Sequence, residues 1–237
     1  MPAYNAAKTL RETYEAIPQD DVDDIILVDD ASYDQTLRRA QKLDLLAIHH
    51  PHNFGYGGNQ KTCYTEALRR GADIVIMLHP DGQYDPRLIP QIMQPIKDGK
   101  AEVVLGSRML DPRAARAGGM PLYKFVSNIF LTTLENAVFG LRLAEYHSGY
   151  RAFSRKFLEG VPFMRNANDF VFDQQILAQA VQFGFRITEI PITTRYFKEA
   201  SSISLRDSLV YGLQTLWLLV VYRLHRWRVI RSRLFVP

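Results

Sequence analysis

Short apolar runs that end in polar turns are the feature that most limits how this chain can fold. The clearest run begins at Ile74 and ends at Leu78, and the turn after it carries His79, Asp81 and Asp85. A continuous apolar run that is too short for a comfortable helix is typical of a strand buried on both faces, as in a parallel sheet. In such sheets, ligands bind beyond the carboxyl ends of the strands. The sequence therefore predicts a ligand site at this turn.

The apolar runs alternate with segments of helical character. Strands are predicted at residues 24–30, 46–50, 74–78 and 102–108, and helices at residues 7–17, 34–43, 59–70 and 88–98. This alternation indicates an α/β fold with a doubly wound, mostly parallel sheet. Because residues 1–5 are typical of the loop that follows a strand, we expect the first strand to be missing.

The second half of the chain has a different character. Residues 109–119 are rich in Arg, Ala and Gly and are expected to form a loop. A polar turn is predicted at residues 145–151, an extended segment at residues 186–194, and helices at residues 126–141, 169–183 and 205–227.

Composition places the chain among ordinary globular proteins. Hydrophobic residues make up 47% and charged residues 23% of it, which excludes an intrinsically disordered chain. The single cysteine, Cys63, excludes an internal disulfide and fits a reducing compartment. The first residues lack the basic region and apolar stretch of a signal peptide. The excess of basic residues lies at one apolar end rather than along a face with interleaved stacking groups, so we expect no binding to nucleic acid.

Carboxylates follow two of the predicted strands, Asp29 and Asp30 after one and Asp81 after another. One strand end could bind a base or ribose by accepting hydrogen bonds, while the other holds a divalent cation that bridges phosphates. Alternate residues of an extended segment point the same way, so His79 and Asp81 can face one metal ion. The competing interpretation is an ordinary polar turn after a core strand. The residues alone leave both interpretations open.

A glycine-rich segment, Asn53–Gly58, precedes the helix predicted from residue 59. Free backbone N–H groups at a helix N-terminus can meet an anion. The segment lacks the spacing of a known phosphate loop, however. We therefore interpret its glycines as letting the backbone pass close to a ligand.

Seven short motifs occur here in the order in which the family-2 glycosyltransferases carry them. The motifs are Pro2–Asn5, Val28–Ser32, Asn53–Gly58, His79–Gln83, Gly106–Arg108, Ser148–Arg151 and Ile190–Ile192. Within that family the chain most resembles the dolichyl- or polyprenyl-phosphate sugar transferases, over nearly its whole length. The resemblance implies a nucleotide-diphospho-sugar transferase fold of the GT-A type over residues 1–204, followed by an amphipathic helix and basic tail over residues 205–237. It also implies inverting, metal-dependent transfer of a sugar from a nucleotide-diphosphate sugar to a polyprenyl-phosphate or other glycan acceptor.

The resemblance further implies the roles of individual residues. Those that would bind the nucleotide sugar are Pro2, Tyr4, Asp30, Asn53, Gly55, Asp81 and Arg108. Those that would act in catalysis are Asp173, Arg151 and Glu145, and those that would hold the acceptor phosphate are Arg195 and Ser202. The ligands of a divalent metal, Mn²⁺ or Mg²⁺, would be His79 and Asp81. His79 replaces the first aspartate of the family's D-x-D motif, and a neutral imidazole is a poorer partner for Mg²⁺ than for Mn²⁺.

The C-terminal helix raises the question of a membrane. Residues 208–222 carry no charge, but they are fewer than the roughly 20 apolar residues that span a bilayer. Trp217, Tyr222 and Trp227 stand beside a run of arginines, which predicts a helix lying in the bilayer interface on the cytosolic side. The protein would then be cytoplasmic and peripherally bound. The alternative is that this helix packs on the sheet or on a second subunit, which would make a homo-oligomer.

Other functions, and purely structural roles for several of these residues, stay open. The chain could be a soluble glycosyltransferase with a saccharide acceptor, or a catalytically impaired nucleotide-sugar binder. A nucleotidyltransferase would need a basic glycine-rich loop after its first strand, which residues 2–5 do not supply. Without the resemblance, Asp173 would be assigned to a solvated helix face and Arg195 to a surface strand. His147 is expected to be a hydrogen-bonded turn residue, and Tyr146 and Tyr150 are expected to serve packing.

Overall fold

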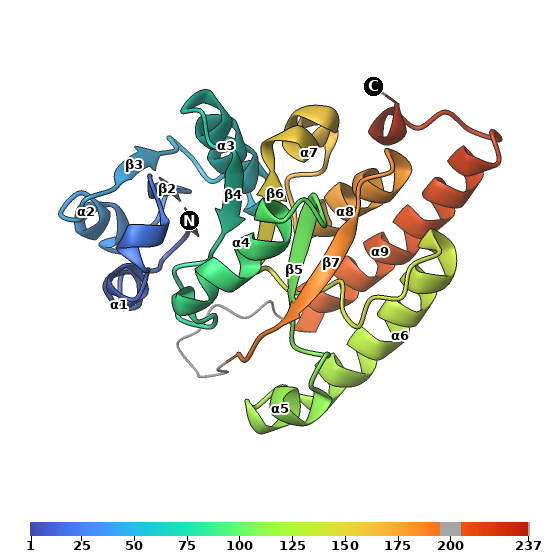
Figure 1. Cartoon of the computed structure of the whole chain (residues 1–237), viewed down its shortest axis with the longest axis horizontal. Helices are drawn as coiled ribbons and strands as arrows, with labels where there is room; N and C mark the ends of the chain where they lie inside the picture. The colour runs from blue at the N-terminus through green and yellow to red at the C-terminus, as the bar shows by residue number, and fades with distance from the viewer. Residues whose placement is uncertain (195–204, 237) are drawn as a thin grey trace.

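The computed structural model describes residues 1–194 and 205–236. In chain order its strands and helices are β1 (Pro2–Ala3), α1 (Leu10–Glu15), β2 (Ile26–Asp29), α2 (Thr36–Ala40), β3 (Leu46–His49), α3 (Tyr56–Arg69), β4 (Ile74–Met77), α4 (Ile89–Lys97), β5 (Val103–Ser107), α5 (Pro112–Ala117), α6 (Leu122–Phe139), β6 (Arg151–Ser154), α7 (Arg155–Gly160), α8 (Phe172–Gln182), β7 (Ile187–Pro191) and α9 (Leu205–Arg226). Figure 1 shows this order as a colour gradient from the N-terminus to the C-terminus of the chain.

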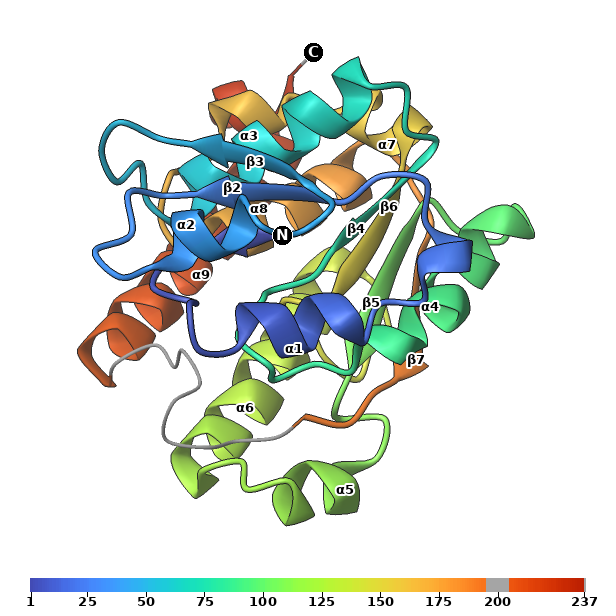
Figure 2. The ribbon, with the colours of Figure 1, turned by 90° about the vertical axis from the view of Figure 1, so that its left-hand side faces the viewer.

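The strands form two hydrogen-bonded groups, in the orders β1-β2-β3 and β4-β6-β5-β7. All strand pairs are parallel except those made by β6, which runs antiparallel to both β4 and β5. Helices stand on both faces of these strands (Figure 2). The predicted α/β fold with a doubly wound, mostly parallel sheet is therefore confirmed.

The first residues are part of a strand rather than of the predicted loop. The backbone N–H of Val28 donates to the carbonyl of Met1 at 3.0 Å, and that of Asp30 donates to Ala3 at 2.9 Å. Pro2 and Ala3 thus form β1, parallel to β2. This pairing brings Tyr4, directly after β1, to the same edge as the carboxyl end of β2.

The sequence patterns missed β6, α5 and α7. The predicted loop at residues 109–119 contains α5, whose residues PRAARA are strong helix formers with proline at the first position. The Asp111 carboxylate accepts the backbone N–H of Arg113 at 3.1 Å, as an N-terminal cap does. Strand β6 is only four residues long and is buried along its whole length, so neither alternation nor an apolar run marked it.

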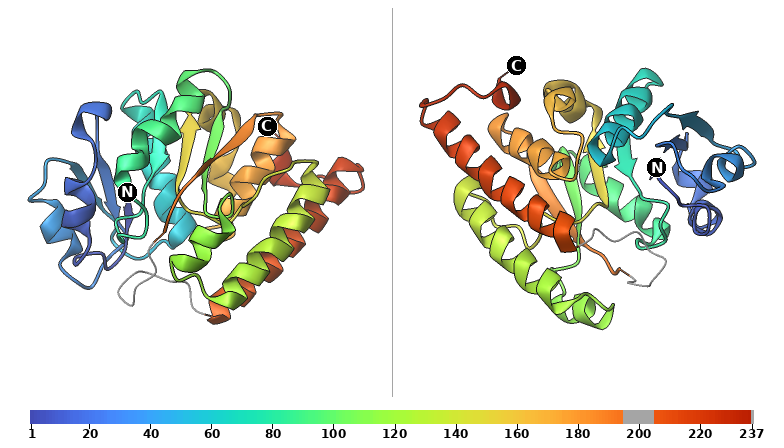
Figure 3. Two further views of the ribbon diagram at one scale, coloured as in Figure 1. Left: turned by 60° about the horizontal axis from the view of Figure 1, so that its bottom comes forward. Right: turned by 180° about the vertical axis from the view of Figure 1, so that it is seen from behind.

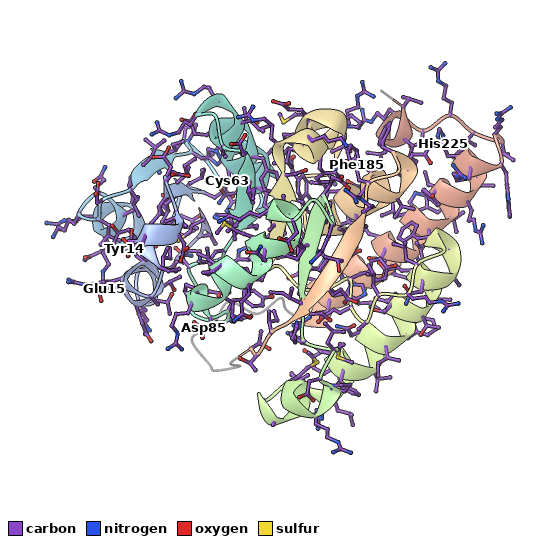
Figure 4. The ribbon with its side chains drawn as sticks, viewed as in Figure 1. Tyr14, Glu15, Cys63, Asp85, Phe185 and His225 are labelled. Atoms are coloured by element: carbon purple, nitrogen blue, oxygen red, sulfur yellow. The ribbon has the colours of Figure 1, made fainter. Side chains whose placement is uncertain are left out.

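Two hydrophobic cores lie on opposite faces of the larger sheet. Successive residues of β5 alternate between them, since Val103 and Leu105 belong to one core and Val104 to the other. The first core packs under α3, α8 and α9 and includes Cys63, which is labelled in Figure 4. The second core packs under α1 and α4. Burial on both faces explains why the sheet strands read as continuous apolar runs.

The two long helices α6 and α9 lie side by side at the end of the molecule opposite β1–β3, as the two views in Figure 3 show. Leu218, Leu219 and Tyr222 of α9 belong to the first core. Other apolar side chains of the pair face outward, including Val126 and Phe130 of α6 and Leu213 and Trp217 of α9. Among the described helices, none combines the length and apolar character needed to cross a membrane.

Candidate active site

A cleft of about 990 Å³ lies beyond the carboxyl ends of β1, β2, β4 and β5. All seven predicted donor-site residues line it, and so does His79, the second predicted metal ligand besides Asp81: the residues are Pro2, Tyr4, Asp30, Asn53, Gly55, His79, Asp81 and Arg108. Asp173 from α8 also lines it. Parallel strands bring these residues to one edge because their carboxyl ends point the same way. Asp30 and Asp81 therefore share one cleft, as the sequence predicted.

The Asp30 carboxylate holds the glycine-rich loop in place. Its Oδ1 accepts the backbone N–H of Phe54 at 2.8 Å, and its Oδ2 accepts that of Gly55 at 3.0 Å. The imidazole of His50 lies 2.7 Å from Oδ1, and Asp30 is buried. Asp30 therefore shapes the wall of the cleft through the loop, in addition to lining the cleft itself.

Two glycines of this loop make room for a neighbouring segment of the protein. A Cβ added to Gly55 would lie 2.5 Å from the carbonyl oxygen of Asn168, and φ of Gly55 is +85°. A Cβ on Gly57 would lie 2.5 Å from the carbonyl of Ala167 and 2.7 Å from Cβ of Phe172. The close neighbour of both glycines is the segment that leads into α8. Gly55 also lines the cleft, so the expectation that the loop passes close to a ligand stays a prediction.

His79 and Asp81 lie in the turn after β4, and both line the cleft. Nε2 of His79 lies 3.2 Å from the hydroxyl oxygen of Tyr56, and Oδ1 of Asp81 accepts the backbone N–H of Gln83 at 3.0 Å. Burial lowers the pKa of His79 despite the negative charges of Asp81 and Asp173. The imidazole is therefore neutral at pH 7, which is the form that ligates metals.

The residues at this turn fit a divalent cation that is completed by the substrate. Within residues 1–194 and 205–236, no three His, Cys, Asp or Glu side chains are grouped to hold a metal ion by themselves. One imidazole nitrogen and one carboxylate oxygen suit Mn²⁺, and such sites commonly take their other ligands from phosphates and water. Space is kept for the imidazole, since a Cβ on Gly149 would lie 2.9 Å from its Nε2.

Asp173 faces the same end of the cleft and is only 8% exposed. Its Oδ2 accepts the Tyr56 hydroxyl at 2.8 Å, and its Oδ1 accepts the side-chain amide of Gln60 at 3.0 Å. Burial, together with the charge of Asp173, raises the pKa of Tyr56 well above its ordinary value, so this hydroxyl keeps its proton. Asp173 is thus a buried, hydrogen-bonded carboxylate, and its assignment to a solvated helix face is wrong.

Arg108 and Glu145 form a buried ion pair at the end of β5. The Glu145 carboxylate accepts the backbone N–H of Arg108 at 2.7 Å and the guanidinium Nε at 2.8 Å, and Arg108 Nη2 also donates to it. Asn128 of α6 donates to the same carboxylate at 2.7 Å. Burial alone would raise the pKa of Glu145, but the charge and hydrogen bonds of Arg108 outweigh it, and the pKa lies below its ordinary value.

Arg151 lies beneath the cleft. Its guanidinium donates to the backbone carbonyls of Tyr146, Ser148 and Asp173 at 2.7–3.0 Å, and the side chain is fully buried. Among the described residues, neither Arg151 nor Glu145 belongs to the cleft wall. Both therefore hold the turn at residues 145–151 in position. Arg195 and Ser202 lie outside the described residues.

A second polar group near the cleft was not predicted from the sequence. His147 Nδ1 lies 2.8 Å from the Tyr211 hydroxyl of α9, and its Nε2 lies 3.0 Å from the buried carboxylate of Glu135 on α6. Gln174 of α8 donates to the Tyr211 hydroxyl as well. His147 was expected to be a hydrogen-bonded turn residue, which is confirmed. Its partners come from three distant helices, so no local spacing could have indicated them.

The cleft changes character where it passes between α6 and α9. Apolar side chains line much of this part, namely Met120, Phe130, Leu131, Leu213 and Leu216, although polar residues of the same helices, such as Lys124 and Asp207, line it as well. Tyr211 and Gly212 of α9 also line the cleft. The cleft therefore offers a charged end to a hydrophilic ligand and an apolar end to a hydrophobic one.

Comparison with known proteins bears on this arrangement. Residues 1–161 match the family model described as Glycosyl transferase family 2. The UDP-N-acetylglucosamine–dolichyl-phosphate N-acetylglucosaminyltransferase of Methanococcus voltae is 31% identical over 213 residues, which cover 83% of this chain and 84% of that protein. The undecaprenyl-phosphate mannosyltransferase of Micrococcus luteus is 26% identical over 203 residues, which cover 81% of each.

A solved structure matches the fold over a similar extent. Glucosyl-3-phosphoglycerate synthase from Mycobacterium tuberculosis, crystallised with Mn²⁺, uridine-diphosphate-glucose and glycerol 3-phosphate, aligns with a TM-score of 0.70 at 19% identity. The alignment covers 93% of this chain and 77% of that one. At this level of identity the likeness concerns the fold, and it confirms the fold class expected from the sequence motifs.

Proposed function

The chain belongs to glycosyl transferase family 2, and from that membership we propose that it moves a sugar from a nucleotide-diphosphate sugar to a polyprenyl-phosphate acceptor, with inversion at the anomeric carbon. One observation carries the proposal: a single cleft joins a polar end with His79, Asp81 and Asp173 to an apolar end between α6 and α9. A soluble saccharide acceptor would have no use for the apolar end.

The polar end has the groups that a nucleotide-sugar donor requires. Tyr4 is 45% exposed at the rim, where its ring can meet a base, and Asp30 holds the adjoining loop. His79 and Asp81 would hold a divalent cation, which when bound would neutralise charge on the departing pyrophosphate. Arg108 lies in the same wall, and its ion pair with Glu145 fixes the orientation of its guanidinium.

An ionised phosphate acceptor needs little help from a base. Displacement of the nucleotide diphosphate requires a nucleophile placed in line with the leaving group, and a phosphate is already deprotonated near neutral pH. Asp173, whose two oxygens are fixed by Tyr56 and Gln60, would orient the acceptor or the sugar at the reacting centre. Arg195 and Ser202 are proposed to contact the acceptor phosphate on the strength of the family resemblance alone.

The relatives support a lipid-linked acceptor. Two of them are a dolichyl-phosphate N-acetylglucosaminyltransferase and an undecaprenyl-phosphate mannosyltransferase, and a further relative at 26% identity is the polyprenol monophosphomannose synthase of Mycolicibacterium smegmatis. These names differ in the sugar but agree on a polyprenyl carrier. We therefore propose that this chain shares with these relatives a polyprenyl-phosphate acceptor.

The outward face of α6 and α9 supports binding at a membrane surface. Leu213 and Trp217 of α9 are 59% and 66% exposed, and Val126 and Phe130 of α6 are each 56% exposed. Five arginines from Arg223 to Arg233 stand near the end of α9, where they could meet anionic lipid headgroups. An interfacial position on the cytosolic side would bring the polyprenyl chain to the apolar end of the cleft.

A transfer assay tests the proposal. Nucleotide-diphosphate sugars labelled in the sugar are offered with Mn²⁺, together with either undecaprenyl phosphate or soluble saccharides. The wild-type protein is expected to transfer the label to the lipid fraction, and Asp81→Ala is expected to transfer none. Label found only in saccharides would show that the acceptor is a saccharide and not a lipid. Binding of the donor without transfer to either acceptor would show that the protein is a nucleotide-sugar binder and not an enzyme. Asp85→Ala, in the same turn but outside the cleft wall, is the control for a general disturbance of the turn.

A further inference from the structure

The hydroxyl of Tyr56 joins His79 to Asp173. Its oxygen lies 3.2 Å from Nε2 of His79 and 2.8 Å from Oδ2 of Asp173. The three residues come from the first turn of α3, the turn after β4 and the first turn of α8. The rings of Tyr56 and His79 are stacked, with centroids 5.5 Å apart and an angle of 17° between the planes. This contact therefore fixes the imidazole in both position and orientation.

The direction of each hydrogen bond follows from the chemistry of the groups. An ionised carboxylate only accepts hydrogen bonds, so the single proton of the Tyr56 hydroxyl is donated to Asp173. The Tyr56 oxygen can then only accept from His79, which places the ring proton of the neutral imidazole on Nε2. The lone pair is left on Nδ1. In the part of the chain that the structure describes, Nδ1 makes no hydrogen bond.

We infer that Tyr56, held by Asp173, is a positioning residue that fixes the tautomer of His79, so that Nδ1 is the nitrogen offered to a divalent cation shared with Asp81. The inference rests on the proposed metal-dependent function. A carboxylate at position 79 could use either of its oxygens and would need no such partner. An imidazole has one lone pair, and a cation can use it only when the other nitrogen carries the proton. Hydrogen bonds to the second nitrogen of a ligating histidine typically change metal affinity about 10–100-fold.

The experiment compares Tyr56→Phe with Tyr64→Phe in the full chain. Tyr56→Phe keeps the stacked ring and removes only the hydroxyl. Tyr64 lies on the same helix, and its hydroxyl donates to Gln60, which in turn donates to Asp173. Tyr64→Phe therefore disturbs the other oxygen of Asp173 without touching His79. Two quantities are measured: the protonated nitrogen of His79 in the metal-free protein, by long-range ¹H–¹⁵N NMR assigned with His79→Asn, and the affinity for Mn²⁺ with UDP or GDP, by electron paramagnetic resonance of free Mn²⁺.

The expected result is a proton on Nε2 in the wild type and in Tyr64→Phe, and a mixture of tautomers in Tyr56→Phe. Tyr56→Phe should bind Mn²⁺ about tenfold more weakly, and Tyr64→Phe should bind it like the wild type. A wild-type proton on Nδ1, or equal Mn²⁺ affinity in the wild type and Tyr56→Phe, would overturn the inference alone. A wild type that binds no Mn²⁺ with either nucleotide would overturn the metal-dependent function and this inference together. Thermal unfolding of each variant confirms that it is folded.

Discussion

The carboxylate of Glu145 accepts both the backbone N–H and the guanidinium of Arg108, at 2.7 and 2.8 Å. Both partners are buried, with side-chain exposures of 0% for Glu145 and 11% for Arg108. The pair joins the end of β5, which carries a residue of the cleft wall, to the turn before β6. Removing one member of such a pair leaves an uncompensated charge in the interior, and this cost decides the effect of a substitution.

Glu145→Gln is expected to lower the free energy of unfolding by about 3 kcal/mol at pH 7. The pKa of Glu145 is lowered in the folded protein, so its contribution is fully present above the ordinary glutamate pKa and disappears as pH falls through the lower folded value. The wild-type and variant stabilities should therefore begin to converge below about pH 4.5 and meet only below the folded pKa of Glu145. Urea unfolding between pH 7 and pH 3 measures both effects.

The control for this prediction is Glu159→Gln. Glu159 pairs with Arg155 at 2.7 Å, but it is 54% exposed, and exposed pairs contribute only about 0–1 kcal/mol. A loss in Glu145→Gln no larger than in Glu159→Gln would contradict the role given to the buried pair.

The strand ends could be predicted from the sequence because a buried parallel strand and its polar turn are local patterns. Asp30, His79, Asp81 and Arg108 each follow an apolar run, and each lines the cleft. The environment of Asp173 could not be predicted in this way. Its neighbours Gln174 and Gln179 are polar yet almost fully buried, since they bond to groups from α9 and from residues 162–166. Only the tertiary fold distinguishes such a helix from one with a solvated face.

Asp30→Asn is expected to weaken donor binding and to lower stability by about 1–3 kcal/mol. The amide can present only one oxygen to the N–H groups of Phe54 and Gly55, which the carboxylate now accepts with two. The loop that forms the wall of the donor site would then lose its anchor. Isothermal titration with UDP and GDP, together with thermal unfolding, measures the two losses. Asp44→Asn, at an exposed position, is the matched control. Unchanged nucleotide affinity in a destabilised Asp30→Asn would restrict Asp30 to a structural role.

Gly57→Ala tests why the loop is rich in glycine. The new methyl group would lie 2.5 Å from the Ala167 carbonyl oxygen and 2.7 Å from Cβ of Phe172, and overpacking of this kind costs about 1–3 kcal/mol. Gly212→Ala is the opposite case, because a Cβ there meets no atom within 4 Å. As a substitution inside α9, it should stabilise the protein by about 0.5–1 kcal/mol. Urea unfolding measures the free energy of unfolding of both variants. Equal changes of the same sign in the two variants would contradict the packing argument.

The site residues that the sequence did not predict have one thing in common: the role of each depends on partners that are distant in the sequence. Tyr56 stands inside the predicted glycine-rich loop, yet its hydroxyl acquires meaning only from β4 and α8. Tyr211 lies in an apolar helix, and its partner His147 is 64 residues away. The one signal in the sequence was Tyr211 itself, a tyrosine within an uncharged helical stretch, because a buried tyrosine hydroxyl usually finds a hydrogen-bond partner.

Leu213→Ser with Trp217→Ser is expected to reduce binding to vesicles of phosphatidylcholine and phosphatidylglycerol at least tenfold. Full burial of each side chain in the bilayer interface contributes about 1.5–3 kcal/mol, and both are largely exposed in the protein alone. For the same reason thermal unfolding should change little. Sedimentation with vesicles measures the partition. Tyr33→Ser is the control, because Tyr33 is an aromatic residue that is 89% exposed but lies in the loop after β2 rather than on α6 or α9. Equal vesicle binding by the wild type, the double variant and Tyr33→Ser would contradict the proposal that this face binds a membrane.

His79→Asp is expected to shift the metal preference of transfer from Mn²⁺ toward Mg²⁺. Mg²⁺ is bound through carboxylate, phosphate and water oxygens, whereas an imidazole suits the later transition metals. The substitution also places a further carboxylate beside Asp81 and Asp173, so the metal-free variant should be less stable than the wild type and should regain stability when Mg²⁺ and nucleotide are added. The ratio of kcat/KM with Mg²⁺ to that with Mn²⁺ is the deciding measurement, with Asp81→Ala expected to lose activity with both metals. An unchanged ratio in His79→Asp would mean that His79 is not a ligand, and that Asp81 alone connects the protein to the cation.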